Sequence, residues 1–247
     1  MWLNQQQITD DAIRAYRKLL RSSTPSYLVI DDLFVSDKLD QINQALQQEQ
    51  HWQTQKHSYA ALYVSDSTWQ KTPQAQRFVQ RDLWLKPDAA NATDTAGHSV
   101  SASGKNAAEF LTFLRSEEFM LLLSRIFRVK LTDKNVAKPE LNTNYFRLCH
   151  KDFVNQHADD SPGREVCMLL YLNKNWQPHM GGELVFMGHN NQPVVIPPLY
   201  NRCVLFDPSS EGAEHWVKAV TADGGCNNNS GNTSQYRYNI TSWYWSE

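Results

Sequence analysis

The pattern of apolar and polar residues changes in character about halfway along the chain. In the first half, apolar residues recur at the three- and four-residue spacing of amphipathic helices. Helices are predicted at 8–22, 37–49 and 107–127. Short strands are predicted at 27–30, 59–64 and 78–85. The last helical region is apolar enough to pack against a sheet, and Ser116 is expected to break it by capping a second helix.

Beyond Pro139 the spacing becomes that of β-strands, in short runs separated by Gly, Pro and Asn turns. Strands are predicted at 143–149, 153–158, 165–173, 183–187, 193–196, 202–206, 214–220 and 235–245. Short strands without intervening helices are typical of a jelly roll or barrel. We therefore predict a mainly β fold with flanking helices (α+β), built as a double-stranded β-helix of the jelly-roll or cupin-like kind.

The length of 247 residues is compatible with one large domain, and the sequence has no internal repeat. We predict a single domain over 1–247, in which a support region of about 1–140 carries the double-stranded β-helix of about 141–247. The stretch 87–106 consists of small and polar residues without periodicity, so it is predicted to be a mobile loop within this domain.

Composition narrows the range of partners. The net charge of −2 gives no electrostatic reason to expect nucleic acid or an anionic membrane. No run is long enough to span a membrane, and Met1–Gln5 lacks the pattern of a signal peptide.

The four cysteines, Cys149, Cys167, Cys203 and Cys226, show no C-x-x-C spacing, which argues against a zinc knuckle. Thiols without a signal peptide indicate a reducing compartment, and we expect a cytoplasmic protein.

Three residues form a candidate metal site. His157 and Asp159 are an H-x-D pair in a strand-like segment, where side chains two apart share a face. His215 lies in a later strand-like run. Two imidazoles and one carboxylate form the facial triad of non-haem Fe(II) oxygenases, which leaves coordination positions open for a co-substrate and oxygen. His150 and Asp152 are a second H-x-D pair, so the pattern alone is not specific.

A series of further motifs makes the assignment more specific. In chain order these are Asp152-Phe153-Val154-Asn155-Gln156-His157-Ala158-Asp159, Arg164, Tyr171–Trp176, Gly181–Leu184, Pro197, Asn201-Arg202, Phe206, Glu214–Val217 and Arg237–Tyr244. With this series, residues 143–245 resemble the prolyl-4-hydroxylase-like branch of the Fe(II)/2-oxoglutarate-dependent dioxygenases, which includes the hypoxia-sensing prolyl hydroxylases. Residues 27–49 resemble the lead-in strand and helix of that family more weakly. Only His157 carries the full lead-in, so it is favoured over His150.

The resemblance implies a set of roles. Iron ligands would be His157, Asp159 and His215, and Arg237 would bind the distal carboxylate of 2-oxoglutarate. Tyr171 and Thr241 would be further donors to this co-substrate. The implied cofactors are Fe(II), 2-oxoglutarate and O2, with ascorbate as a further candidate. The implied reaction is hydroxylation of an unactivated C–H bond with release of succinate and CO2, and a prolyl residue in a protein or peptide is the favoured substrate.

Two positions depart from the family pattern. Lys151 stands where a Gly commonly precedes the Asp-Phe pair. Arg237 lies further beyond His215 than usual, because the Gly-, Asn- and Ser-rich piece 222–234 intervenes, and this piece is predicted to be a long hairpin loop. Other roles remain open for two residues: Arg237 as the partner of a structural carboxylate such as Glu183, and Tyr171 as a core residue.

Alternative functions also remain open. The chain could hydroxylate a small molecule or a free amino acid, or be a metal-dependent cupin-type enzyme that does not use 2-oxoglutarate. A non-catalytic jelly-roll binding module is a third class. Arg237 and Tyr171 argue against the cupin-type enzyme, and the two histidines with one aspartate argue against the binding module. The stretches 52–80 and 87–106 are candidate lids over the substrate.

Overall fold

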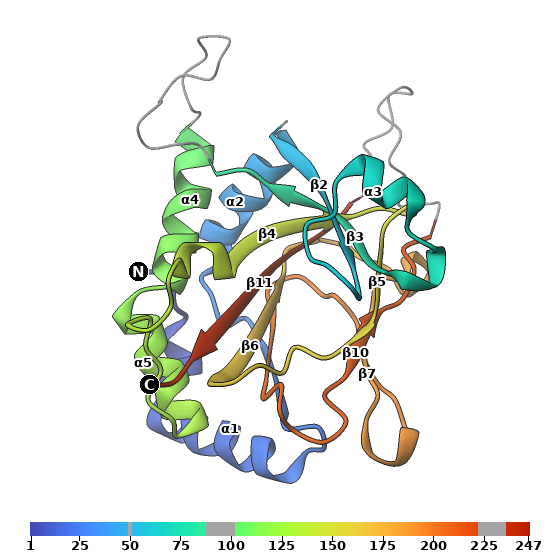
Figure 1. Ribbon diagram of the computed structural model, residues 1–247. Coiled ribbons are helices and arrows are strands. Elements are labelled where there is room, and N and C mark those ends of the chain that lie inside the picture. Colours follow the sequence, from blue (N-terminus) through green and yellow to red (C-terminus); the bar gives the residue numbers. More distant parts are fainter. Residues whose placement is uncertain (49–50, 87–101, 222–235) are drawn as a thin grey trace.

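A computed structural model describes residues 1–48, 51–86, 102–221 and 236–247 (Figure 1). The helices are α1 (Asp10–Ser22), α2 (Ser36–Gln48), α3 (Asp66–Lys71), α4 (Ala102–Leu114) and α5 (Glu117–Phe127). The strands are β1 (Tyr27–Asp31), β2 (Trp52–Ser58), β3 (Arg77–Trp84), β4 (Thr143–Leu148), β5 (Phe153–His157), β6 (Arg164–Tyr171), β7 (Leu184–Phe186), β8 (Val194–Ile196), β9 (Arg202–Phe206), β10 (His215–Val217) and β11 (Arg237–Trp245). Predicted loop 222–234 and most of 87–106 lie outside the described residues.

Local capping explains where the helices begin. The Thr9 side chain accepts a hydrogen bond from the Ala12 amide at the start of α1. Ser116 does the same for the Phe119 amide at the start of α5, so the predicted break between α4 and α5 is confirmed. Helices α1, α2, α4 and α5 lie along one side of the sheet in Figure 1.

The strands form one antiparallel system in the order β1-β9-β6-β11-β4-β3-β5-β10-β7-β8, with β2 paired to β3 at the edge. Strand β3 pairs with both β4 and β5, so it joins the two halves of the jelly roll. This is the mainly β fold with flanking helices that the sequence predicted, arranged as a double-stranded β-helix.

Strict alternation along the strands separates two environments. On β6, Val166, Met168 and Leu170 belong to the large core shared with the helices. Their neighbours Cys167 and Leu169 face the interior of the jelly roll. Strand β11 alternates in the same way. Its residues Tyr238, Ile240 and Tyr244 are in the helix-side core. Its residues Arg237, Asn239, Thr241 and Trp243 line an interior cavity.

The region 52–84 differs from the prediction. Strand β2 was missed because it is an edge strand with a mostly polar, partly exposed pattern that pairs only with β3. The predicted strand 59–64 is instead a turn, in which Tyr63 has a positive φ of 57°. Helix α3 follows, and the side chain of Ser65 caps it. The candidate lid 52–80 is therefore regular structure over most of its length.

Two other expectations are corrected. Residues 102–106, predicted as loop, belong to α4. Cys149 is disulfide-bonded, so the expectation of four thiols is wrong for this residue. Cys167 and Cys203 are free and buried, as predicted. Within the described parts of the chain, no helix is long and apolar enough to cross a membrane.

Candidate active site

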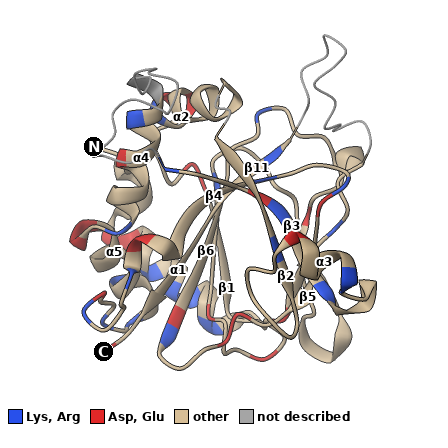
Figure 2. Cartoon of the chain, turned by 45° about the horizontal axis from the view of Figure 1, so that its top comes forward, with Lys and Arg blue, Asp and Glu red and all other residues tan. Residues whose placement is uncertain are grey.

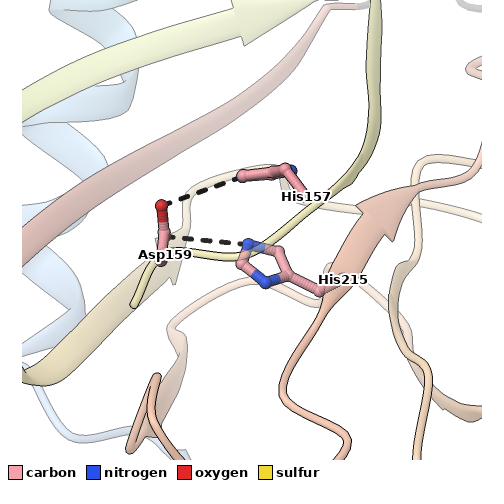
Figure 3. Close-up of side chains that lie close together, drawn as sticks. All are labelled: His157, Asp159 and His215. Carbon is pink, nitrogen blue, oxygen red and sulfur yellow. Dashed lines mark ion pairs between the residues drawn. The ribbon is translucent and has the colours of Figure 1, made fainter. Parts of the chain in front are cut away.

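His157 and His215 meet because β5 and β10 are neighbouring strands. The two histidines are direct partners in the antiparallel register, at the end of β5 and the start of β10. Asp159 lies two residues beyond β5, in irregular structure, so the predicted shared strand face is wrong although the residues converge. Their ligand atoms all lie within 4.8 Å of one another (Figure 3).

Backbone carbonyl groups orient both imidazoles. Nδ1 of His157 lies 2.9 Å from the Asn155 carbonyl oxygen, and Nδ1 of His215 lies 3.0 Å from that of Ala213. Each ring therefore turns its Nε2 atom towards Asp159, at 3.9 Å from Oδ1 for His157 and 3.8 Å from Oδ2 for His215. A carbonyl acceptor on one imidazole nitrogen is the usual device that fixes a metal-binding histidine.

Asp159 is held ionised. Its Oδ2 accepts a hydrogen bond from Trp243 Nε1 at 2.9 Å, and its main-chain carbonyl oxygen accepts one from Arg164 Nη1. Burial would raise the pKa of Asp159, but the two histidines, Trp243 and Arg164 together lower it below its ordinary value. Burial also lowers the pKa of His215 to about 4, helped by His157. An ionised carboxylate and a neutral imidazole are the forms that bind a metal.

Among the residues that the structure describes, His157, Asp159 and His215 are the only group of three or more that could hold a metal ion. The rival pair at His150 does not join them. Asp152 instead accepts a hydrogen bond from the Cys149 amide at 2.9 Å and thereby stabilises the turn between β4 and β5. The donor set of two imidazoles and one carboxylate fits the facial site of a non-haem iron enzyme.

Arg237 is a buried cation beside this group. Its Nε donates to the Gly182 carbonyl and its Nη1 to Asn239 Oδ1, each at 2.7 Å. Its Nη2 is buried and has no hydrogen-bond partner in the described parts of the chain. Burial lowers the pKa of Arg237, with Tyr171 acting in the opposite direction. The alternative pairing with Glu183 is not seen, because Glu183 pairs with Lys218 at 3.6 Å.

Tyr171 and Thr241 differ in their access to the cavity. The Tyr171 ring lies against Arg237, with 4.9 Å between its centroid and the guanidinium carbon. Its hydroxyl is buried and has no partner at hydrogen-bonding geometry. Tyr171 is not among the cavity-lining residues, whereas Thr241 is. Thr241 Oγ1 accepts from Asn239 Nδ2 at 3.0 Å.

Asn239 is the site residue that the sequence reasoning missed. It connects Arg237 to Thr241 by hydrogen bonds and lines the same cavity. The period of two along β11 was a signal for it, since Asn239 stands between two candidates on the same strand face.

These residues face a cavity of about 900 Å³. The more buried part of its lining, here called the floor, includes His157, Asp159 and His215 (the candidate metal triad) with Arg237, Asn239 and Thr241. The exposed part, here called the mouth, includes Tyr59–Tyr63 from the turn between β2 and α3 and Leu141 from the short helix η3 (Pro139–Asn142). Tyr59 in this turn donates its hydroxyl to the Gln156 carbonyl at 2.8 Å, one residue before His157. Within the predicted lid region 52–80, this turn lines the cavity together with Gln55 and His57 of β2 and Phe78 and Val79 of β3.

Comparison with known proteins identifies a matching family model and several similar solved structures. Residues 138–245 match the model of the 2OG-Fe(II) oxygenase superfamily. The structure is similar to a prolyl-4-hydroxylase of Pseudomonas putida, with 15% identity, coverage of 95% of this chain and 99% of the other, and a TM-score of 0.57.

Two more solved structures show the same fold. A Trichoplax adhaerens prolyl hydroxylase in complex with a hypoxia inducible factor oxygen degradation domain peptide fragment is 19% identical, with 96% and 94% coverage and a TM-score of 0.61. A 2OG-Fe(II) oxygenase family oxidoreductase of Burkholderia pseudomallei is 14% identical, with 96% and 92% coverage and a TM-score of 0.57. No curated protein sequence matches the chain.

Proposed function

We propose that the protein is an Fe(II)/2-oxoglutarate-dependent dioxygenase of the prolyl-4-hydroxylase-like branch. The match of residues 138–245 to the 2OG-Fe(II) oxygenase superfamily and the fold similarity to two prolyl hydroxylases support this proposal. The proposed reaction is hydroxylation of an unactivated C–H bond, with a prolyl residue in a protein or peptide as the favoured substrate. One observation carries the proposal: a preorganised group of two imidazoles and one carboxylate shares a cavity with a buried, incompletely paired arginine.

His157, Asp159 and His215 would hold the iron. The carbonyl groups behind the imidazoles keep the Nε2 atoms pointing to the ion, and Trp243 fixes the carboxylate from the other side. When bound, iron and 2-oxoglutarate supply the oxidising chemistry with O2, and succinate and CO2 are released.

Arg237 would position the co-substrate. Its bonds to Gly182 and Asn239 fix the guanidinium, and they leave both Nη2 hydrogens and one Nη1 hydrogen for a carboxylate. Thr241 can add a hydroxyl group from the same strand face. The Tyr171 ring would support the Arg237 guanidinium. A direct hydrogen bond from its unpaired hydroxyl to the distal carboxylate would require the carboxylate to reach past the observed cavity lining.

The cavity mouth supports a peptide or protein as substrate. Four apolar or aromatic side chains of the mouth are exposed: Tyr59 (54%), Leu62 (62%), Tyr63 (71%) and Leu141 (56%). Exposed apolar groups around an opening are typical of a surface that receives a partner. The volume of about 900 Å³ is near the upper end for ligand sites, so it leaves room beyond a small co-substrate.

The test is succinate release from 2-oxoglutarate by the Fe(II)-loaded protein, with proline-containing peptides added in turn. Succinate formation that peptides stimulate is expected. No succinate under any of these conditions would contradict the proposal. Stimulation by free amino acids alone would move the assignment to the small-molecule class.

Metal titration tests the ligand assignment separately. Each of His157→Ala, Asp159→Ala and His215→Ala should abolish binding of Fe(II) or Mn(II). His150→Ala is the matched control, because it removes the rival histidine, and it should bind metal like the wild type. If His150→Ala lost the metal and His157→Ala kept it, the assigned site would be wrong.

A further inference from the structure

The cavity lining carries an excess of positive charge. Its Lys and Arg residues are Arg81, Lys138, Arg164 and Arg237, and its single carboxylate is Asp159. Arg164 already pairs with Asp159, and Arg237 is assigned to the co-substrate. A divalent iron and a dianionic 2-oxoglutarate add no net charge, so the loaded site would keep the positive excess of its lining. Among the four cations, Arg81 and Lys138 have no assigned anionic partner.

Two neighbouring side chains fix the position of the Arg81 guanidinium in the cavity wall. Its Nε donates to Gln55 Oε1 at 3.2 Å, and its guanidinium carbon lies 3.4 Å from the centroid of the Phe146 ring. Its terminal nitrogens make no hydrogen bond or ion pair within the described ranges. Figure 2 shows basic and acidic positions next to each other on β3, but Asp82 points to the other strand face and pairs with Arg147 at 3.0 Å.

His57 is a second, independent sign of an absent ligand. It lies on β2 opposite Val79, so it shares the cavity face of the β2–β3 hairpin with Arg81. It is only 7% exposed, and within residues 1–48, 51–86, 102–221 and 236–247 neither of its ring nitrogens has a hydrogen-bond partner. A buried polar group without a partner requires an explanation, and a bound molecule provides one. Burial lowers the pKa of His57 to about 4, so the ring is neutral and can donate one hydrogen bond.

We propose that Arg81, with His57 and Gln55 beside it, binds a carboxylate of the molecule that is hydroxylated. This inference rests on the proposed function and specifies its substrate class: the substrate carries a negative charge close to the reacting C–H bond. The hairpin that forms this subsite lies outside residues 138–245, so the family match does not include it. The carboxylate can come from an acidic residue beside proline in a peptide or from a free amino acid.

The experiment compares carboxylate and amide probes on protein loaded with Mn(II) and 2-oxoglutarate under anaerobic conditions. One pair is L-proline and L-prolinamide. The other pairs are amidated five-residue peptides with central proline and one flanking Glu or Gln at each position in turn. At least one carboxylate should bind about tenfold more tightly than its amide. If no carboxylate is preferred, the proposal is wrong. The pair that shows the preference identifies the source.

Variants then test the residue. Arg81→Gln should reduce binding of the preferred carboxylate to the level of its amide, and Arg81→Lys should restore part of the difference. A merely structural role for Arg81 would weaken both members of a pair equally. Lys138→Gln is the matched control, because it removes an exposed cation from the same lining. An equal effect of Lys138→Gln would mean general electrostatic attraction and would overturn the subsite.

The same variants distinguish this inference from the proposed function. If Arg81→Gln loses affinity for 2-oxoglutarate itself, Arg81 anchors the co-substrate and the proposed subsite is wrong. If the wild type neither binds nor turns over 2-oxoglutarate, the proposed function fails instead. The preference between carboxylate and amide probes can then still be measured on the Mn(II)-loaded protein.

Discussion

Replacing Arg237 by alanine is the most direct test of the co-substrate site. Arg237 is 1% exposed, and its Nη2 atom has no hydrogen-bond partner among the residues that the structure describes. A carboxylate placed there would complete the hydrogen bonds of a buried cation. Loss of one partner from such a charge-assisted pair costs about 2–5 kcal/mol, which corresponds to a roughly 30- to 5000-fold weaker affinity for 2-oxoglutarate.

The structure also predicts a cost in stability. Arg237→Ala removes the donors to the Gly182 carbonyl and to Asn239 Oδ1. Each buried acceptor left unpaired costs about 1–3 kcal/mol, so the free energy of unfolding should fall. Arg237→Lys keeps a charge but loses the planar fork, and its affinity for 2-oxoglutarate should be intermediate. Neither variant removes a residue of the metal triad, so both should bind Mn(II) like the wild type.

The assay is the dissociation constant of 2-oxoglutarate for the Mn(II)-loaded variants under anaerobic conditions, measured well below their melting temperatures. A dissociation constant for Arg237→Ala within about threefold of the wild type would refute the reasoning. The cupin-type enzyme that does not use 2-oxoglutarate would then be the better assignment.

Two further substitutions test features around the site. Gly182 has a φ of +76°, and a Cβ atom there would lie 2.8 Å from Arg237 Cδ, so Gly182→Ala should displace Arg237 and weaken 2-oxoglutarate binding. Gly163→Ala is the control for backbone strain, because Gly163 has a similar φ of +74° but its Cβ would lie 3.7 Å from the nearest atom, Trp245 Cδ1. Equal binding losses in both would contradict this. Burial raises the pKa of Asp152 to about 6, so its proton stabilises the fold below about pH 4 and this contribution is lost as pH rises through 6. The difference in unfolding free energy between Asp152→Asn and the wild type should therefore shift by about 1–2 kcal/mol in favour of the variant as the pH rises from 4 to 7. Urea unfolding at the two pH values measures this difference, and a value that does not change with pH would count against the prediction.

The C-terminal half was predictable because burial on both sides of its strands leaves a clear pattern in the sequence. The strand runs beyond Pro139 all correspond to observed strands, with identical bounds for β9 and shifted ends for the others. The direct pairing of His157 with His215 was not predictable, since cross-strand register depends on the whole sheet rather than on either segment. The order of the motifs in the sequence therefore predicted which residues form the candidate site, but the distances between them could be obtained only from the folded structure.

The hairpin β2–β3 shows why the remaining part of the site escaped prediction. Strand β2 has polar residues on both faces: Thr54 and Lys56 lie on one face, and Gln53, Gln55 and His57 lie on the other, where Gln55 and His57 line the cavity. A polar residue that faces a ligand cavity has the same pattern in the sequence as one that faces water. Arg81 and His57 could therefore be found only after the hairpin had been placed beside the metal triad.

The alternation along β11 has a consequence for how this protein can change over evolution. One nine-residue strand supplies both the floor of the cavity and part of the wall against which the helices pack. Inserting or deleting a single residue within it would exchange the two sets, placing Arg237 among apolar side chains and an aromatic residue in the cavity. Divergence in this strand is therefore confined to substitutions that keep its length, and changes in chain length are tolerated only outside its ends.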